Sequence, residues 1–422
     1  MKIIFAEVIT IGDELLYGQT LDTNTQWMGQ ELNRVGIKIS RKMAIGDRRE
    51  DIVSALDEAQ QRADIILITG GLGPTKDDIT KTTLADYFDS PISVHPQALA
   101  DLKSLFAQRN YPLTALNEQQ AALPDKCEMV PNAMGTAPGM WFEQDGKVFV
   151  SMPGVPYEMK AMMTSTVLPR LQETFALPVI FHQMIQTVGI GESWLAEKIA
   201  DWETALPEHI RLAYLPSFGK VKLRLTATGD NLLDLEEEVA TQVTALEPLI
   251  KKYIFGYGDI SLEEAVGRDL LAAGKTLALA ESCTGGLVAH RVTSVPGSSR
   301  YFRGGLIPYD NALKVKPLGV AQATLREHGA VSEATVREMA AKVRTLLGAD
   351  VGLATSGIAG PGGGTAEKPV GTIWIAVADE EGTYAKKLTL TNNRMVNVQR
   401  TNVAVLNLLR LRLNDLLKGV EN

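Results

Sequence analysis

The sequence contains little cysteine and no excess of positive charge. Only two of its 422 residues are cysteines, Cys127 and Cys283, and their separation matches no metal-binding pattern. The sequence therefore implies no disulfide framework, which is typical of a reducing compartment. A formal net charge of −8 gives no support to nucleic acid or an anionic membrane surface as a partner.

Long apolar runs, repeats and low-complexity segments are also missing. No apolar stretch approaches the length of a membrane span. The opening segment MKIIFAEVITIGDE contains Glu7 and enters a Gly-Asp turn, so we expect a first strand there and no signal peptide. These features predict a cytoplasmic protein. A hydrophobic content of 45% and a charged content of 22% are ordinary for globular domains, and the length suggests two to four of them.

The first third of the chain alternates between apolar strands and amphipathic helices. We expect strands over 3–11, 38–45 and 64–69, with helices over 25–35 and 49–62. This order predicts a parallel sheet with crossover helices.

A glycine-rich loop, GGLGPTKDD, occupies residues 70–78, directly after the third expected strand. Open α/β sheets bind ligands at this end of their strands. The glycines allow backbone N–H groups to approach a phosphate, and Asp77 and Asp78 could hold a divalent cation against it. The alternative is an ordinary helix start with these carboxylates in its first turn.

Three segments in this region resemble the MogA/MoaB-like molybdopterin-binding domain, as it occurs in the CinA (competence/damage-inducible) family: GDELLYGQTLDTN, TGGLGPTKDD and MPGVPYEM. The resemblance implies a three-layer α/β domain over 1–172. It also implies metal-dependent ADP-ribose pyrophosphatase activity, with Mg²⁺ or Co²⁺ held by Asp77 and Asp78. The implied site comprises Gly12, Asp13, Glu14, Asp22, Asn24, Asp47, Gly70, Gly71, Gly73, Pro74, Thr75, Asp77, Asp78, Gly154 and Glu158.

The middle of the chain, 173–257, carries no catalytic spacing. Expected strands over 211–214 and 220–228 and an expected helix over 233–248 predict a small α+β connecting domain. The segment GIGES, residues 189–193, is more simply interpreted as a turn than as a ligand contact.

The most informative stretch is LALAESCTGG, residues 277–286. It predicts a strand and a turn with three nucleophile-type residues, Ser282, Cys283 and Thr284, before a helix. The helix N-terminus would offer N–H groups to an anion or an oxyanion. The alternative is that Ser282 or Thr284 merely caps the helix.

A hydroxyl nucleophile needs a base, and no histidine is suitably placed. A lysine with a pKa lowered by burial can serve, and a tyrosine can relay a proton. Ser282 with Lys314 and Tyr309 is therefore a sensible hydrolase set. Cys283 is the competing nucleophile, because helix N-termini depress thiol pKa values.

Five further segments resemble the C-terminal CinA domain, the nicotinamide mononucleotide amidohydrolase family: AESCTGG, VPGSSRYFRGG, YDNALK, HGAVSE and SGIAGPGGGTAEKPVGTIWIA. The resemblance implies an α/β domain over 258–422 that deamidates nicotinamide mononucleotide without a cofactor. It implies Ser282, Tyr309 and Lys314 as catalytic residues, and Arg394 or Arg400 as the phosphate ligand. The other expected substrate-binding residues are Thr284, Gly285, Gly286, Ser356, Gly357, Gly360 and Gly362.

The sequence thus predicts a bifunctional, homodimeric enzyme of pyridine-nucleotide salvage. Its expected partners are nicotinamide mononucleotide and ADP-ribose, with no nucleic acid and no membrane. Two alternatives stay open at this point. The N-terminal domain would be a non-catalytic pterin- or nucleotide-binding regulator, or the chain would be a competence or DNA-damage adaptor.

Overall fold

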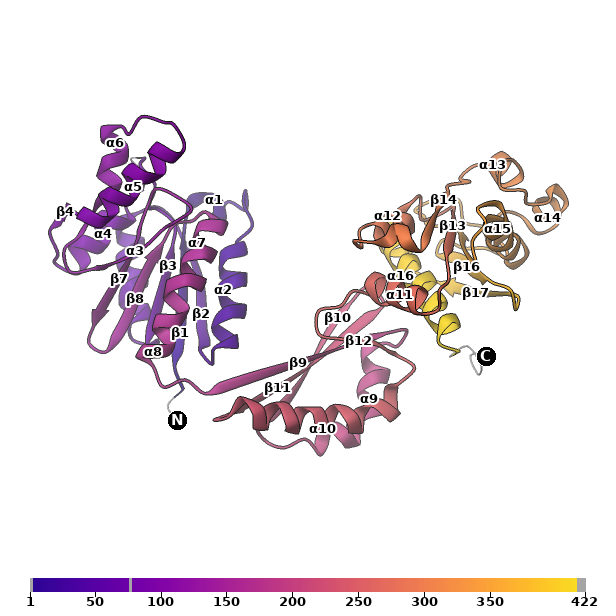
Figure 1. The fold of residues 1–422 in the computed structure, drawn as a ribbon, viewed down its shortest axis with the longest axis horizontal. Coiled ribbons are helices and arrows are strands. Elements are labelled where there is room, and N and C mark those ends of the chain that lie inside the picture. The colour runs from indigo at the N-terminus through magenta and orange to yellow at the C-terminus, as the bar shows by residue number, and fades with distance from the viewer. Residues whose placement is uncertain (1–2, 76–77, 416–422) are drawn as a thin grey trace. The chain divides into compact units, whose positions relative to one another are not determined.

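A computed structural model describes residues 3–75 and 78–415. The chain forms two compact units, Met1–Phe181 with Thr228–Leu235, and His182–Ala227 with Glu236–Asn422. Figure 1 shows the elements of each unit. Among the described residues, no helix is both long and apolar enough to cross a bilayer. The division into domains at 172 and 257 stays a prediction.

The N-terminal domain is built on a six-stranded sheet in the order β2-β1-β3-β8-β7-β6. Its strands are β1 (Phe5–Ile11), β2 (Lys38–Ile45), β3 (Ile65–Thr69), β6 (Glu128–Val130), β7 (Gly139–Gln144) and β8 (Lys147–Met152). The pairs within β2-β1-β3-β8 are parallel, whereas β6 and β7 are antiparallel. The sheet is therefore mixed, with the expected crossover helices around its parallel half.

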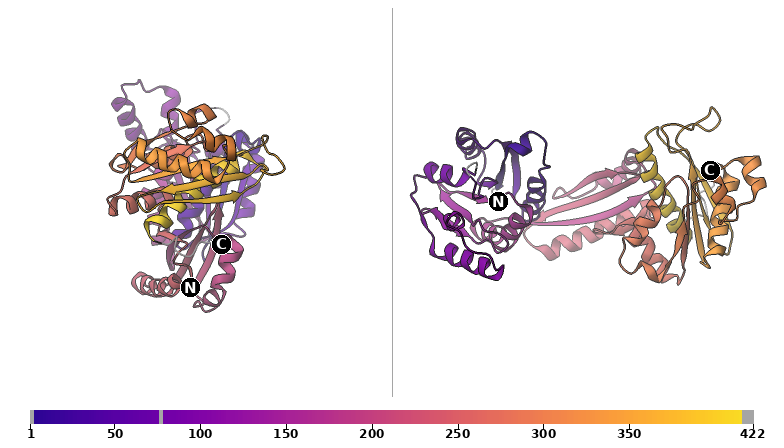
Figure 2. Two further views of the ribbon diagram at one scale, coloured as in Figure 1. Left: turned by 90° about the vertical axis from the view of Figure 1, so that its right-hand side faces the viewer. Right: turned by 90° about the horizontal axis from the view of Figure 1, so that it is seen from above.

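Helices cover both faces of this sheet, as the right-hand view of Figure 2 shows. On one face, Met28 and Leu32 of α2 pack with Met159 and Met162 of α7. On the other face, Leu56 of α3 and Leu84 of α4 pack against strand side chains. The layers confirm the expected three-layer α/β arrangement. The helices are α1 (Asp13–Leu16), α2 (Thr23–Arg34), α3 (Arg49–Ala59), α4 (Thr80–Tyr87), α7 (Pro156–Met162) and α8 (Leu168–Thr174).

A small subdomain is inserted between α4 and β6. It pairs β4 (Ile92–Val94) with β5 (Ala122–Pro124) and contains α5 (Pro96–Gln108) and α6 (Ala115–Glu118). One tight turn, Gln119–Ala121, joins α6 to β5.

The strand register determines where the N-terminal loops lie. Thr10 of β1 pairs with Thr69 of β3, and Thr69 pairs with Met152 of β8. Because the three strands are parallel and end together, the loops that follow them meet at one edge of the sheet.

The middle segment forms a four-stranded sheet in the order β10-β11-β9-β12. Two helices accompany it, and the indole N–H of Trp202 in the first donates to the carbonyl of Gln242 in the second. The elements are β9 (Val179–Val188), α9 (Glu192–Thr204), β10 (Ile210–Ser217), β11 (Lys220–Gly229), α10 (Leu232–Ile250) and β12 (Ile254–Tyr257). This is the small α+β arrangement that the sequence predicts.

The C-terminal domain has a five-stranded sheet in the order β14-β13-β15-β16-β17. The three strands β14, β13 and β15 are parallel, and β16 and β17 continue antiparallel. The strands are β13 (Leu277–Glu281), β14 (Phe302–Leu306), β15 (Val351–Gly357), β16 (Thr372–Ala378) and β17 (Thr383–Thr389).

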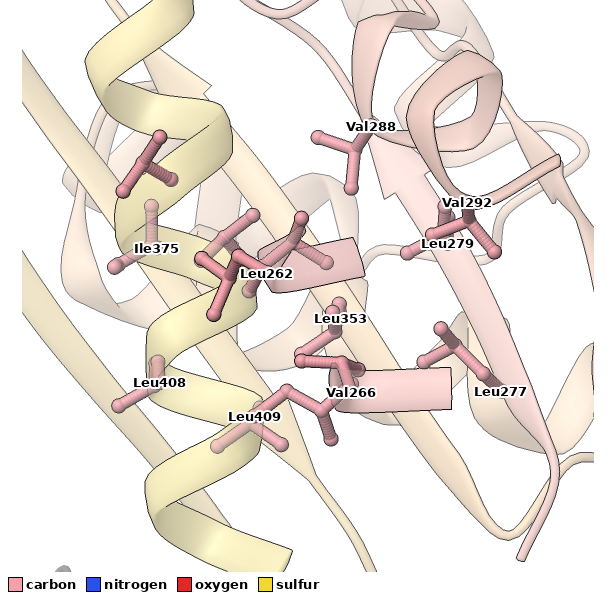
Figure 3. Packing of buried hydrophobic residues seen from close by; sticks show 14 of the residues in the cluster. Leu262, Val266, Leu277, Leu279, Val288, Val292, Leu353, Ile375, Leu408 and Leu409 are labelled. Carbon is pink, nitrogen blue, oxygen red and sulfur yellow. The ribbon is translucent and has the colours of Figure 1, made fainter. Parts of the chain in front are cut away.

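Helices again cover both faces of this sheet. Figure 3 shows one core, in which Leu262 and Val266 of α11, Val288 of α12 and Leu409 of α16 pack with strand residues. The opposite core contains Val336 and Met339 of α15. The helices are α11 (Leu262–Ala272), α12 (Leu287–Thr293), α13 (Asn311–Val315), α14 (Gln322–His328), α15 (Glu333–Leu346) and α16 (Arg394–Leu413).

Candidate active sites

A polar cavity of about 210 Å³ lies at the strand ends of the C-terminal domain. Glu281 of β13 pairs with Thr355 of β15, so Ser282 and Ser356, which come next, lie side by side. The cavity brings together Ser282, Tyr309, Lys314, Ser356, Gly357 and Arg394 from the predicted set. Its other lining residues are Cys283, Asn311, Ala330, Val331 and Ala359.

The turn after β13 is fixed by a residue that the sequence analysis did not single out. The buried carboxylate of Glu281 accepts hydrogen bonds from the N–H groups of Gly286, Val288 and Ala289, at 3.0, 3.0 and 2.7 Å. It thereby neutralises the N-terminus of α12 from inside the protein. A carboxylate directly before the SCT segment was the available signal.

This arrangement corrects the expectation for Gly285 and Gly286. The N–H of Gly285 donates to the carbonyl of Ser282, and that of Gly286 to Glu281, so neither is free for a substrate oxygen. Both glycines instead permit the turn through their positive φ angles of 61° and 100°. Among the described residues, no protein oxygen accepts from the N–H groups of Cys283 and Thr284.

The two competing nucleophiles differ in their surroundings. Burial raises the pKa of the Cys283 thiol to about 12, so the thiol is fully protonated near neutral pH. Ser282 is buried against the cavity, and its backbone N–H is held by the carbonyl of Thr355 at 3.0 Å. The hydroxyl of Thr284 shares a hydrogen bond with Thr355 at 2.8 Å and does not line the cavity.

Lys314 is almost fully buried, with 2% of its surface exposed. Its ammonium donates to the carbonyls of Pro308 and Tyr309 at 2.8 and 3.1 Å. Burial lowers the pKa of Lys314, and the nearby Asp310 carboxylate partly offsets this. Lys314 therefore lines the same cavity as Ser282, and its pKa is shifted in the direction that a general base requires.

Arg394 connects two parts of the cavity. Its guanidinium donates to the phenol oxygen of Tyr309 at 2.8 Å and to the carbonyl of Gly360 at 2.9 Å. Ser356 donates to the carbonyl of Ala330 at 2.6 Å. Arg400 lies six residues further along α16 and lines a different, mostly apolar cavity. Gly362 is exposed and also lies outside the Ser282 cavity.

A second polar cavity, of about 400 Å³, lies where the loops after β1, β3 and β8 meet. Ten predicted residues line it: Gly12, Glu14, Asp47, Gly70, Gly71, Gly73, Pro74, Asp78, Gly154 and Glu158. The sequence analysis missed its remaining lining residues, which are Ile11, Leu72, Gln120, Thr136, Ala137, Pro153 and Val155.

Four predicted residues of the N-terminal set do not line this cavity. Asp22 caps α2 by accepting from the N–H of Thr25 at 2.9 Å. Asn24 donates to the carbonyl of Gly154 at 2.7 Å and so supports the loop after β8. Asp13 donates its backbone N–H to Asp47, and Thr75 donates its N–H to Asp78. Asp77 lies outside the described residues.

The described lining of this cavity is acidic. Glu14, Asp47, Asp78 and Glu158 contribute carboxylates, and no Lys, Arg or His is among the lining residues that the structure describes. Glu158 accepts from the amide of Asn132 at 2.7 Å. Within 3–75 and 78–415, no three acidic, His or Cys side chains are grouped closely enough to hold a metal ion.

The fold and the two cavities define a multidomain α/β protein with a polar cavity at the strand ends of each α/β domain. Three family models match consecutive parts of it. They are the "Probable molybdopterin binding domain" over 7–173, the "Damage-inducible protein CinA KH domain" over 182–256, and the "CinA C-terminal domain" over 259–413.

Full-length relatives agree with these matches. A CinA-like protein from Cytophaga hutchinsonii is 50% identical over 98% of this chain and 99% of its own length. One from Salinibacter ruber is 42% identical over 93% of this chain and 95% of its own length. The chain therefore belongs to the CinA family.

Solved structures of CinA proteins match parts of the chain. One from Thermoplasma acidophilum is 32% identical, covering 41% of this chain and 99% of its own, with a TM-score of 0.37. A competence/damage inducible protein, CihA, from Agrobacterium tumefaciens is 36% identical, covering 36% of this chain and 93% of its own, with a TM-score of 0.35.

Proposed function

We propose that the C-terminal domain hydrolyses the carboxamide of nicotinamide mononucleotide to nicotinate mononucleotide and ammonia. The observation that carries this proposal is the joint placement of Ser282, Tyr309, Lys314 and Arg394 around one cavity. Ser282 is the only hydroxyl there that directly follows β13, and a buried lysine faces the same space. This combination suits attack by a serine on an amide carbon.

The reaction proceeds through an ester on Ser282. Neutral Lys314 takes the Ser282 proton as Oγ bonds to the amide carbon, and then delivers that proton to the departing ammonia. Water, activated by the same lysine, hydrolyses the ester and restores the hydroxyl. The N–H groups of Cys283 and Thr284 are the donors available to the oxyanion. Arg394 supplies a cation for the substrate phosphate.

A pair of neighbouring substitutions tests this assignment. Ser282→Ala removes the nucleophile and should lower ammonia release by roughly 10³-fold or more. Cys283→Ala should leave kcat/KM within a few-fold of wild type, because the buried thiol takes no part. Ammonia release that survives Ser282→Ala, or that is lost in Cys283→Ala at unchanged Tm, would contradict the assignment.

For the N-terminal domain, we propose metal-dependent hydrolysis of the pyrophosphate of ADP-ribose. The supporting observation is a glycine-lined cavity that contains four carboxylates and no described cationic side chain. A diphosphate enters such a cavity favourably only with a cation. Because Mg²⁺ is usually held by one or two carboxylates together with substrate phosphates, the lack of a three-carboxylate group is compatible with it. Asp78, one of the two carboxylates that the sequence predicts for this role, would hold the ion, which would polarise the phosphoryl oxygens.

The test measures ADP-ribose cleavage with Mg²⁺ or Co²⁺ in wild type and Asp78→Asn. We expect cleavage to be lost in the variant, while deamidation continues. Binding of ADP-ribose or a pterin without cleavage by wild type would instead favour the regulatory alternative.

We further propose that the enzyme acts in the cytoplasm as a homodimer. Analytical ultracentrifugation would test the oligomeric state.

A further inference from the structure

One side chain in the N-terminal cavity has a polar atom that is buried without a partner. Gln120 is 5% exposed and lines the cavity between β1, β3 and β8. Its carboxamide oxygen is buried and accepts no hydrogen bond from any group that the structure describes. Buried amides are almost always paired, so this one requires an explanation.

The backbone around Gln120 is held firmly on both sides. The carbonyl of Gln119 accepts from the Lys81 ammonium at 2.9 Å, and the carbonyl of Ala121 accepts from the N–H of His95 at 2.9 Å. The tight turn Gln119–Ala121 therefore holds the Gln120 side chain at the cavity without any bond of its own. Such preorganisation is typical of a group that binds a ligand.

The chemistry of an unpaired carboxamide limits the ligand group that it can bind. A primary amide presents an acceptor beside a donor in one plane. Phosphate oxygens only accept, so they would leave the buried amide oxygen unpaired. A nitrogen heterocycle with a donor next to an acceptor, such as the N6–H and N7 of adenine, pairs with both amide groups at once. The nearby aliphatic lining of Leu72 and Ala137 suits a flat ring.

We propose that Gln120 is the specificity residue of the N-terminal cavity and binds the donor–acceptor edge of a nitrogen heterocycle. Resting on the proposed pyrophosphatase function, this heterocycle is the adenine of ADP-ribose. The same edge chemistry occurs in a pterin ring, so the experiment distinguishes the two sources.

The experiment is titration calorimetry on the full chain with Mg²⁺ and three probes: the α,β-methylene analogue of ADP-ribose, which resists hydrolysis, neopterin, and inorganic pyrophosphate. The test variant is Gln120→Met, which has a similar length and no amide. The control is Gln119→Met, since Gln119 is the exposed neighbour. Loss of a paired amide should weaken heterocycle binding by about 10- to 100-fold.

Each result bears on the Gln120 inference, on the proposed pyrophosphatase function, or on both. Weaker binding of the ADP-ribose analogue by Gln120→Met, with pyrophosphate binding unchanged, supports both. If wild type binds only neopterin and Gln120→Met loses it, the inference stands and the pyrophosphatase proposal fails. Equal affinity of wild type and Gln120→Met for every heterocycle that binds overturns the inference alone. Failure of both heterocycles to bind wild type overturns both.

A stability measurement separates ligand binding from a structural role. Replacing an unsatisfied buried amide by an apolar side chain removes a desolvation cost, so the Tm of unliganded Gln120→Met should not fall. Its stabilisation by the ADP-ribose analogue should shrink. A lower Tm with an equal loss of pyrophosphate binding would show a structural role and overturn the inference.

Discussion

Lys314 is the residue whose protonation state controls the proposed deamidation. Only its neutral form accepts the Ser282 proton, so kcat/KM should rise with pH through the pKa of Lys314 and then level. Because burial lowers this pKa from 10.5, the rise should occur below the range of an ordinary lysine. Lys314→Met should lose about 10²–10⁴-fold in rate, whereas the exposed Lys387→Met should not.

Asp310 gives a sharper test of the hypothesis that Lys314 is the general base. Its carboxylate raises the pKa of Lys314, so Asp310→Asn should move the rising part of the pH–rate profile to lower pH. Asparagine still accepts the N–H of Ala312, so the start of α13 should survive. A profile that stays in place, or moves upward, would argue against Lys314 as the base.

Arg394 and Arg400 form a matched pair on one helix. Arg394 lines the Ser282 cavity and Arg400 does not, a distinction that the sequence left open. Arg394→Met should raise KM for nicotinamide mononucleotide by about 10- to 100-fold, as loss of a charged hydrogen bond to phosphate would. Arg400→Met should leave KM unchanged. Equal effects in steady-state assays would remove the phosphate role from Arg394.

For individual residues, the sequence could suggest the residue types of the site but not their hydrogen-bond partners. The resemblance implied Ser282, Tyr309 and Lys314 as one catalytic set, and all three line one cavity, while their catalytic role stays a prediction. It could not show that Glu281 already occupies the N–H groups of Gly286, Val288 and Ala289. Such occupancy depends on a side-chain rotamer and on burial, and neither follows from spacing along the chain.

The start of α12 is the element on which the Ser282 turn depends. Glu281→Gln keeps one acceptor oxygen but directs an NH₂ group toward backbone donors. We expect the free energy of unfolding to fall by about 1–3 kcal/mol, with a loss of deamidase kcat because the turn shifts. Denaturant unfolding measures the first effect. The control is Glu333→Gln in the first turn of α15, where the side chain is exposed, and unchanged stability in Glu281→Gln would contradict the capping role.

Elements with strong periodicity were predictable, and edge elements were not. The expected strand over 38–45 coincides with β2, and the one over 64–69 differs from β3 by a single residue. The edge strands β14 and β17 were missed, because FRGGL has two glycines and TYAKKLT exposes most of its side chains. Neither shows the apolar alternation on which a strand prediction rests.

For the whole molecule, the middle domain raises the question of nucleic acid. KH modules clamp a nucleotide backbone with a GXXG loop, and no such segment occurs within 182–256. That range also contains seven Lys and Arg against eleven Asp and Glu. We predict no measurable binding of single-stranded RNA or DNA at 150 mM salt, by fluorescence anisotropy. Salt-dependent, submicromolar binding would reverse this prediction and favour the adaptor alternative.

The two proposed activities belong to cavities in different compact units, and no residue lines both. Substitutions at independent sites with no shared partners usually have additive effects. We therefore predict that Asp78→Asn leaves deamidation within about two-fold of wild type, and that Ser282→Ala does the same for ADP-ribose cleavage. The double variant should lose both activities without a further change in Tm. A change in nicotinamide mononucleotide KM when the ADP-ribose analogue is added would instead reveal a coupling free energy between the sites, and the N-terminal domain would then act as a regulator.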